Sequence, residues 1–183
     1  MTHLIFGTQK IINKMRAELD IIYGDLIKFA KNGMFDVVTH GCNCLSNMGA
    51  GLAPQMAKEF GCDKFKMEEM GPTIDKLGCI DYETLYWEDD KRWTKYPDEG
   101  GKFSTVKLTV VNSYTQFKYN SQKPLDYEAL TLCMRKINHT FKGKHIGLPQ
   151  IGAGLAGGDW NRIKGIIENE LRDCQVTVVI YKK

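Results

Sequence analysis

The sequence predicts an α/β domain in which a mixed, mostly parallel sheet carries helices on both faces. Short apolar runs typical of buried strands alternate with amphipathic helical patterns along most of the 183-residue chain. Two of these strands end in glycine-rich loops that lead directly into helices, which is typical of open α/β sheets. The length fits one domain better than two, and we expect that domain to span residues 18–183. Residues 1–17 form an N-terminal segment to which the sequence assigns no function.

Strands are expected where short apolar runs lie between turn signals. They are predicted at 19–23, 35–39, 79–87, 103–113, 144–151 and 175–181. Helices are expected where apolar residues recur at helical spacing or follow a capping residue. They are predicted from the cap Asp25 through Lys31, and at about 51–60, 125–141 and 160–171. The polar stretch 88–101 ends in Gly-Gly and is interpreted as a long hairpin or flap.

Composition and charge narrow the class of protein. The net charge of +3 is small and the lysines are mixed with acidic residues, so no direct signal for nucleic acid is present. No apolar run reaches the roughly 18 residues of a membrane span. The N-terminal residues also lack the pattern of a signal peptide. We therefore expect a cytoplasmic protein without a membrane partner.

The six cysteines are scattered through the sequence, and several lie inside apolar runs. This usage indicates reduced thiols rather than a disulfide framework. Cys42 and Cys44 form a Cys-x-Cys pair, but no second Cys-x-x-Cys or histidine pair accompanies it. The sequence therefore predicts neither a metal site nor a bound cofactor.

Two segments share one design, namely residues 36–56 (DVVTHGCNCLSNMGAGLAPQM) and residues 145–163 (HIGLPQIGAGLAGGDWNRI). In each, a buried strand ends in a loop rich in glycine, and a helix starts directly after it. Glycines let the backbone approach a ligand closely, and the free N–H groups of the following helix form an anion site. Two such loops side by side form a clamp for a diphosphate, whereas each alone is also compatible with a plain turn. Neither loop is a Walker A motif or a complete G-x-G-x-x-G dinucleotide motif.

Three motifs stand in a fixed order along the chain. They are Tyr23-Gly24-Asp25-Leu26, then Thr39-His40-Gly41-Cys42-Asn43-Cys44 with Met48-Gly49-Ala50-Gly51-Leu52, and then Leu148-Pro149-Gln150-Ile151-Gly152-Ala153-Gly154-Leu155 with Trp160. Their order and spacing resemble the macro domain family over about residues 18–182. The resemblance implies a three-layer α/β/α fold and the binding of ADP-ribose or a close derivative. The second and third motifs are most similar to those of the ADP-ribose 1″-phosphate phosphatases, while residues 123–130 resemble the terminal ADP-ribose protein glycohydrolases.

The resemblance implies roles for individual residues. Asp25 is expected to accept a hydrogen bond from the adenine amino group, although its carboxylate also suits a helix N-cap. Asn43 is expected to orient the distal ribose, with loop geometry as the alternative. The other residues expected to contact the ligand are Leu26 beside Asp25, Asn47 near the phosphate, Gly49, Ala50, Gly51 and Leu52 in the first loop, and Gly152, Ala153, Gly154, Leu155, Ala156 and Gly157 in the second.

Two alanines depart from the pattern of the family's glycohydrolases. Ala53 stands where the common macro-domain hydrolases carry an aspartate, and Ala156 stands where the terminal glycohydrolase has its catalytic aspartate. Residues 80–84 also offer no clear match for that enzyme's nucleophilic lysine. These departures move the expected chemistry away from glycohydrolysis and toward the 1″ phosphate.

Two side chains are candidates for proton transfer. The sequence shows no Asp-x-Asp pair, no Cys-x₅-Arg and no cluster of histidines and carboxylates, so we expect direct attack by water assisted by an acid or base. His40 is expected at the end of its strand, at the mouth of the first loop, with a buried structural histidine as the alternative. Asp159 closes the second loop, where it also suits the N-cap of the last helix.

We therefore expect the protein to hydrolyse ADP-ribose 1″-phosphate to ADP-ribose and phosphate, without a metal or cofactor. Two alternatives stay open. One is a glycohydrolase that removes ADP-ribose from protein or nucleic acid, in which case an ADP-ribosylated macromolecule is a partner. The other is a reader that binds ADP-ribose without turnover.

Overall fold

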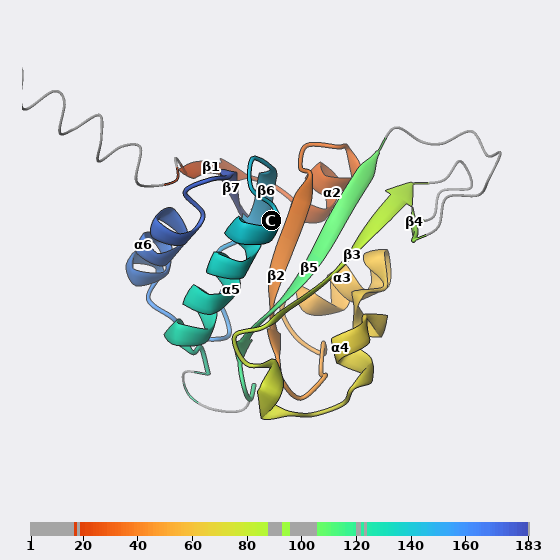
Figure 1. The fold of residues 1–183 in the computed structure, drawn as a ribbon. Helices are drawn as coiled ribbons and strands as arrows, with labels where there is room; N and C mark the ends of the chain where they lie inside the picture. Colours follow the sequence, from red (N-terminus) through yellow and green to blue (C-terminus); the bar gives the residue numbers. More distant parts are fainter. Residues whose placement is uncertain are drawn as a thin grey trace, which may run out of the picture.

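The computed structural model describes residues 17, 19–87, 93–95, 106–119, 122 and 124–182. Within them, a seven-stranded sheet lies between two layers of helices (Figure 1). The strands are β1 (Leu19–Tyr23), β2 (Val37–Asn43), β3 (Ile80–Trp87), β4 (Trp93–Thr94), β5 (Lys107–Gln116), β6 (His145–Pro149) and β7 (Gln175–Ile180). Their order across the sheet is β1-β7-β6-β2-β5-β3-β4.

The strands from β1 to β5 in this spatial order are all parallel to one another. β3 then pairs antiparallel with β5, and β4 pairs antiparallel with β3. The sheet is thus mixed and mostly parallel, as the sequence predicted. Because parallel strands point the same way, their carboxyl ends meet at one edge of the sheet. Both glycine-rich loops leave at that edge and side by side, since they follow the neighbouring strands β2 and β6.

Helices cover both faces of the sheet (Figure 1). On one face lie α2 (Leu26–Lys31), α3 (Ala53–Phe60) and α4 (Lys66–Glu69), and on the other lie α5 (Tyr127–Thr140) and α6 (Trp160–Glu170). Alternate residues of β2 reach opposite faces: Val37 packs in the core beneath α5 and α6, and Val38 in the core beneath α2 and α3. The predicted three-layer α/β/α architecture is confirmed.

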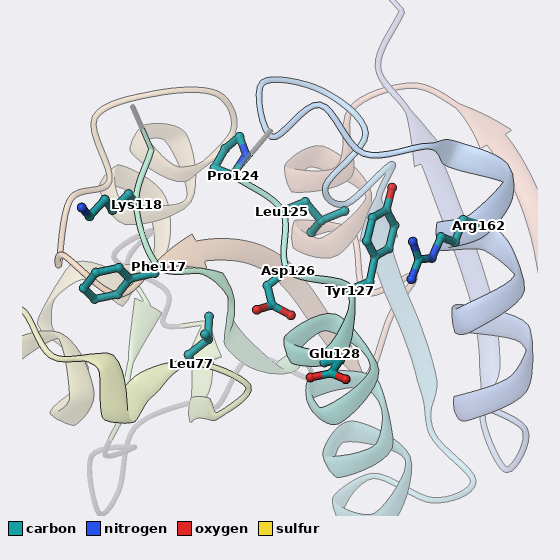
Figure 2. A pocket seen from close by; sticks show the side chains of 9 residues that line it. All are labelled: Leu77, Phe117, Lys118, Pro124, Leu125, Asp126, Tyr127, Glu128 and Arg162. Carbon is teal, nitrogen blue, oxygen red and sulfur yellow. The ribbon is translucent and has the colours of Figure 1, made fainter. Parts of the chain in front are cut away.

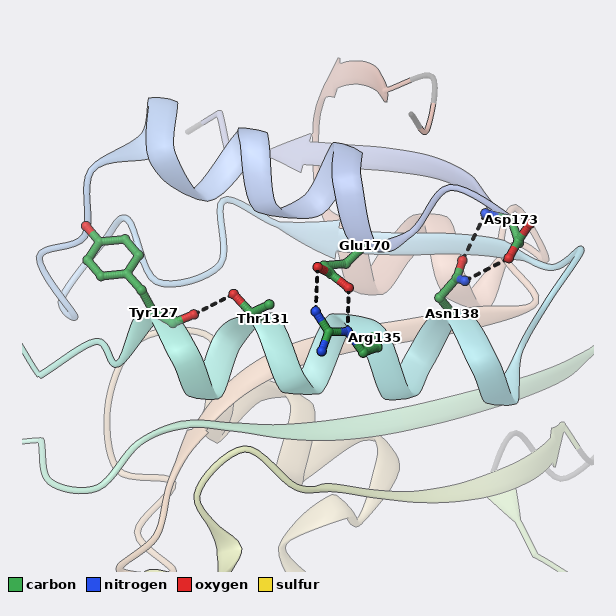
Figure 3. A network of polar contacts seen from close by, with 6 residues as sticks. All are labelled: Tyr127, Thr131, Arg135, Asn138, Glu170 and Asp173. Atoms are coloured by element: carbon green, nitrogen blue, oxygen red, sulfur yellow. Dashed lines mark hydrogen bonds and ion pairs between the residues drawn. The ribbon is translucent and has the colours of Figure 1, made fainter. Parts of the chain in front are cut away.

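The two helices of the second layer are fixed to each other by polar pairs (Figure 3). Nε and Nη2 of Arg135 on α5 donate hydrogen bonds of 2.9 and 3.0 Å to the two carboxylate oxygens of Glu170 on α6. One turn further along, Asn138 and Asp173 exchange two hydrogen bonds of 2.9 Å each. These contacts set α5 beside α6, so the amino ends of both helices lie close to the second glycine-rich loop.

Several element boundaries differ from the predicted ones by a few residues, among them those of β2 and α5. The strand expected at 35–39 is β2, which continues to Asn43 and therefore contains His40 in its interior. α5 begins two residues after the predicted start at 125, because the side chain of Asp126 caps it by accepting a hydrogen bond of 2.9 Å from the backbone N–H of Ala129. Only the first of these shifts changes the interpretation of the site.

The segment between α3 and β3 carries structure that the sequence did not indicate. It holds two short 3₁₀ helices, η1 (Cys62–Lys64) and η2 (Ile74–Lys76), on either side of α4. The predicted flap at 88–101 lies mostly outside the described residues, as does the N-terminal segment 1–16. The described part of the flap includes Trp93, which pairs antiparallel with Trp87 of β3.

All six cysteines carry free thiols, and five of them are buried. Burial raises the pKa of the Cys44 thiol to about 11 and that of Cys62 to about 12, so both stay protonated at neutral pH. Packing, rather than reactivity, explains these positions.

Among the helices of the described ranges, none combines the length and the apolar character that crossing a membrane would require.

Candidate functional site

Loop 1 (residues 44–52) and loop 2 (residues 150–158) lie side by side at the carboxyl edge of the sheet. A Cβ atom added to Gly51 would lie 3.7 Å from Cδ1 of Leu155, so the two loops come within van der Waals reach of each other. Leu155 itself is 76% exposed. The two glycine-rich loops that the sequence predicted to lie side by side are therefore neighbours in the structure.

The side chain of Asn43 gives loop 1 its shape. Its Oδ1 accepts hydrogen bonds from the backbone N–H groups of Leu45 and Asn47 at 3.0 and 3.3 Å, and its Nδ2 donates to the carbonyl oxygen of Asn47 at 2.6 Å. Only 7% of Asn43 is exposed. The alternative role in loop geometry is thus present in the structure, and one amide hydrogen is left over for a ligand.

The far part of loop 1 leaves several backbone donors unused. Oδ1 of Asn47 accepts from the N–H of Gly49 at 2.8 Å, and Gly51 takes a left-handed φ of 66°. α3 then starts at an N-cap, Leu52, that offers no side-chain hydrogen bond. Among the described residues, no acceptor faces the N–H groups of Ala50, Gly51 and Leu52. Such groups at the start of a helix attract anions.

Loop 2 is held by its own backbone. The N–H of Gly157 donates to the carbonyl of Gly154 at 3.0 Å, and the N–H of Gly158 donates to that of Gly152 at 2.9 Å. Gly152 and Gly157 adopt φ values of 75° and 65°, which other residues rarely reach. No acceptor in the described part of the chain faces the N–H groups of Gly154, Leu155 and Ala156. Loop 2 therefore offers a second row of free donors.

The start of α5 supports loop 2, which the sequence did not show. A Cβ at Gly152 or Gly158 would come within 2.8 or 2.3 Å of the Leu125 side chain, so these glycines are needed for close packing. The hydroxyl oxygen of Tyr127 accepts a hydrogen bond of 2.8 Å from the N–H of Asp159. The sequence held one signal for this support, because Leu125 and Tyr127 both lie in the segment 123–130, which resembles the terminal ADP-ribose protein glycohydrolases.

His40 does not lie at the mouth of loop 1, so its expected placement is wrong. Only 1% of it is exposed, and Nε2 donates to Oδ1 of Asn112 at 2.8 Å. Nδ2 of Asn112 donates in turn to the Cys62 carbonyl at 2.9 Å, which fixes this orientation. Burial lowers the pKa of His40 to about 4, and the imidazole is therefore neutral at pH 7. The structure matches the buried alternative, with a side-chain partner in place of a backbone one.

Asp25 and Leu26 stand at the end of β1, beyond loop 2 along the sheet edge. Oδ1 of Asp25 caps α2 by accepting from the N–H groups of Ile27 and Lys28 at 2.9 and 3.1 Å. Among the described residues, its other oxygen has no hydrogen-bond partner, so it is open to a ligand. The side chain of Leu26 is 5% exposed and packs in the core. Leu26 can therefore meet a ligand only through its backbone.

Asp159 is exposed at the end of loop 2. Its Oδ1 accepts a hydrogen bond of 2.8 Å from the N–H of Asn161 and caps α6, as the alternative interpretation anticipated. Its Oδ2 has no partner among the described residues and faces solvent. Asp159 therefore caps the helix and keeps one oxygen available for chemistry.

A pocket of about 590 Å³ opens next to loop 2, rather than between the two loops (Figure 2). It is lined by the first turn of α5, by Phe117 and Lys118 after β5, and by Arg162 on α6. The Cζ atom of Arg162 lies 3.7 Å from the centroid of the Tyr127 ring, and Figure 2 shows the guanidinium beside that ring. Because Leu125 lines this pocket and also packs on loop 2, the pocket lies directly beside loop 2.

The order of the strands and the two facing loops define a protein of the macro-domain fold. Solved structures with this fold include the macrodomain of Thermus aquaticus DarG, with a TM-score of 0.61 and 19% identity over 91% of this chain and 99% of that one. Another is Thermosipho africanus DarTG in complex with ADP-ribose, with a TM-score of 0.61 and 16% identity over 91% of this chain and 43% of that one. A protein of unknown function from Bacteroides thetaiotaomicron gives a TM-score of 0.63 and 22% identity over 90% of this chain and 98% of that one.

The sequence comparison is more specific. No model of a known protein family matches the chain. It is 30% identical over 162 residues to an uncharacterized 17.5 kDa protein from the tk-vs intergenic region of Enterobacteria phage T4, covering 86% of this chain and 93% of the phage protein. The chain belongs to the same family as that phage protein.

Proposed function

We propose that the protein binds ADP-ribose or a close derivative across loop 1 and loop 2. The observation that carries this proposal is the presence of free backbone N–H groups on both loops, at Ala50 to Leu52 and at Gly154 to Ala156. Two facing rows of donors suit the two phosphates of a diphosphate. The DarTG structure, which has the same fold and holds ADP-ribose, supports the choice of ligand.

The two ends of the ligand have separate partners in this proposal. The second carboxylate oxygen of Asp25 accepts from the adenine amino group at the end of β1. The remaining amide hydrogen of Asn43 reaches the distal ribose at the β2 end. Loop 2 lies between them, because β6 stands between β7 and β2. The diphosphate thus crosses the part of the edge where the free N–H groups gather.

We propose further that the bound molecule is ADP-ribose 1″-phosphate and that its phosphate is removed by water. The water oxygen attacks the phosphorus, the bond from phosphorus to the 1″ oxygen breaks, and ADP-ribose leaves with phosphate as the second product. Oδ2 of Asp159 is the group proposed to accept the proton of the water and to pass it to the leaving 1″ oxygen. His40 takes no part, since it is buried and neutral; it holds Asn112, which in turn donates to the Cys62 carbonyl.

Phosphate release from ADP-ribose 1″-phosphate tests the activity. The wild-type protein should release phosphate above background, and Asp159→Asn should lower kcat by roughly a hundredfold or more. Asparagine can still cap α6, so the variant should keep its melting temperature. Asp173→Asn, which changes an aspartate at the other end of α6, is the matched control and should keep its activity. Unchanged release by Asp159→Asn would rule out the proposed role of this carboxylate.

Removal of ADP-ribose from a macromolecule is the second candidate function. The pocket beside loop 2 favours it, because a residue attached to the distal ribose has open space there. Ala53 and Ala156 count against it, since neither supplies a carboxylate. A gel assay with ADP-ribosylated protein and DNA separates the two activities. Calorimetric binding of ADP-ribose without turnover in either assay would instead identify a reader.

A further inference from the structure

A fully buried lysine lies directly beneath loop 1. Lys76 ends η2 and is 0% exposed, yet its Nζ lies 5.4 Å from the centroid of the Tyr114 ring and donates a 2.6 Å hydrogen bond to Oγ of Ser46. Among the described residues, no carboxylate lies within ion-pair distance of this ammonium. Burying a cation is costly unless its surroundings compensate. The contact with loop 1 is therefore a substantial part of what holds Lys76 in place.

The same contact belongs to a buried network that joins four elements. Oγ of Ser46 donates to the carbonyl oxygen of Glu68 on α4 at 3.0 Å. The carboxylate of Glu68, itself 6% exposed, accepts a hydrogen bond of 2.7 Å from the hydroxyl of Tyr114 on β5. Loop 1 is thus tied through Ser46 to η2 and α4, and through Glu68 to the sheet. Tyr114 stands on β5, which borders β2 on the side opposite β6, so this tie reaches the sheet on the side away from loop 2.

Ser46 has an unusual backbone conformation. Within the described ranges it is the one non-glycine residue with a positive φ, at 53°. A left-handed conformation is unfavourable for an L-residue with a side chain and persists only where surrounding contacts hold it. Ser46 lies inside the turn shaped by Asn43, between Leu45 and Asn47, and precedes the free N–H groups of Ala50 to Leu52. Its conformation therefore decides the direction in which the second half of loop 1 runs.

We propose that Lys76 is a positioning residue for ligand binding. Its ammonium holds the Ser46 hydroxyl, keeps Ser46 left-handed, and so keeps the free N–H groups of loop 1 directed toward the anion. The identity of the anion as the diphosphate of ADP-ribose rests on the proposed function. The restraint on loop 1 does not, because it is built from contacts within the chain.

The first test measures ADP-ribose affinity by calorimetry in a suppressor series. Lys76→Met should weaken binding roughly tenfold, which corresponds to the cost of an unsupported left-handed residue. Glycine takes a positive φ freely, so Ser46→Gly combined with Lys76→Met should bind within about threefold of the wild type. The matched control is Lys136→Met, which removes a lysine that donates to the carbonyl of Gly78 at 2.8 Å but does not touch loop 1. It should bind like the wild type.

The second test needs no ligand and measures amide hydrogen exchange across residues 44–52. Lys76→Met should exchange roughly tenfold faster there, and the double variant and Lys136→Met should exchange more slowly than Lys76→Met. If Lys76→Met does not fold, Ser46→Ala removes the same hydrogen bond and should also exchange faster. Unchanged exchange in Lys76→Met, or no recovery in the double variant, overturns the inference. A wild-type protein that binds no ADP-ribose overturns the proposed function alone, because the exchange data still judge Lys76.

Discussion

Loop 1 and loop 2 both present free backbone N–H groups in the proposed site, but different interactions stabilise their conformations. Loop 1 takes its shape from side chains, above all from Asn43, Asn47 and Ser46, with Lys76 below. Loop 2 takes its shape from hydrogen bonds within its own backbone and from glycines against which Leu125 packs. We therefore expect loop 1 to lose its conformation when a side chain is deleted, and loop 2 to lose its conformation when a side chain is added.

The largest expected effect is acid destabilisation of the fold through His40, on the strand that leads into loop 1. The pKa of His40 is about 4 in the folded protein against an ordinary histidine value of 6.5, so the unfolded chain binds the proton first as the pH falls. The free energy of unfolding should be highest above pH 6.5 and should drop by roughly 3 kcal/mol as the pH approaches 4. Urea denaturation across this pH range measures the drop.

The control for this pH effect is His145, the first residue of β6, which shares one hydrogen bond of 2.8 Å with Thr177 of the neighbouring strand β7. His145→Gln should keep the drop below pH 6.5, and His40→Gln should lose most of it. Should His40→Gln not fold, an NMR titration of the wild-type imidazole gives the same answer directly. A His40 pKa near 6.5 would contradict the prediction.

The next largest effect is expected from adding a methyl group to loop 2. In Gly158→Ala the new Cβ would lie 2.3 Å from Cδ2 of Leu125 and 2.9 Å from the carbonyl oxygen of Gly152, so the loop must shift. Overpacking of this kind costs about 2 kcal/mol and should also weaken ADP-ribose binding. Gly165→Ala on α6, whose Cβ would also meet nothing within 4 Å and which lies outside the proposed site, is the matched control. Thermal unfolding and calorimetry should separate the two; equal stability would show that loop 2 tolerates side chains.

Deleting the amide that shapes loop 1 should have an intermediate effect. Asn43→Ala removes three hydrogen bonds from a residue that is 7% exposed, and we expect a loss of about 1 to 2 kcal/mol in stability. Asn47→Ala removes the exposed bond to the N–H of Gly49 and should cost less. Urea denaturation of both variants tests the order. A larger loss for Asn47→Ala would show that the loop is not anchored at Asn43.

The smallest expected effect sharpens the comparison at the helices that follow the loops. α6 is capped by the Asp159 side chain, whereas α3 begins at Leu52 without a side-chain cap. Asp159→Ala should therefore cost about 1 kcal/mol of stability, and Asp159→Asn should cost little. Leu52→Asn offers the first helical N–H groups an acceptor of their own, so it should weaken ADP-ribose binding. Affinity that stays unchanged in Leu52→Asn would argue against an anion at the start of α3.

Much of the fold could be predicted because its signals are local. The apolar runs and the glycine-rich junctions marked the strands, the helices and the two loops, and the order of the motifs indicated the macro-domain fold before the structure showed it. The interior position of His40 could not be predicted, since it depends on how far β2 continues beside β5. The run of apolar residues ends at Thr39, whereas the hydrogen-bonded pairing of β2 with β5 continues to Asn43.

The supports of the site could not be predicted for a related reason. Lys76 looks like an ordinary surface lysine in the sequence, and only folding places it beneath Ser46, 30 residues away. The packing of Leu125 against Gly158 likewise joins residues from two separate elements. Such contacts leave no periodic pattern, so the sequence could name the loops without showing what holds them.

The strand order has one more consequence, because it fixes the distance between Asp25 and Asn43, the two residues proposed to bind the ends of the ligand. Asp25 follows β1 and Asn43 ends β2, and β7 and β6 stand between these two strands. Neighbouring strands are spaced by about 4.8 Å, so the two residues are separated by roughly 14 Å across the sheet. A single nucleoside falls short of that length. Any molecule that contacts both residues must therefore be elongated, and the spacing of the hydrogen-bonded strands sets its minimum length.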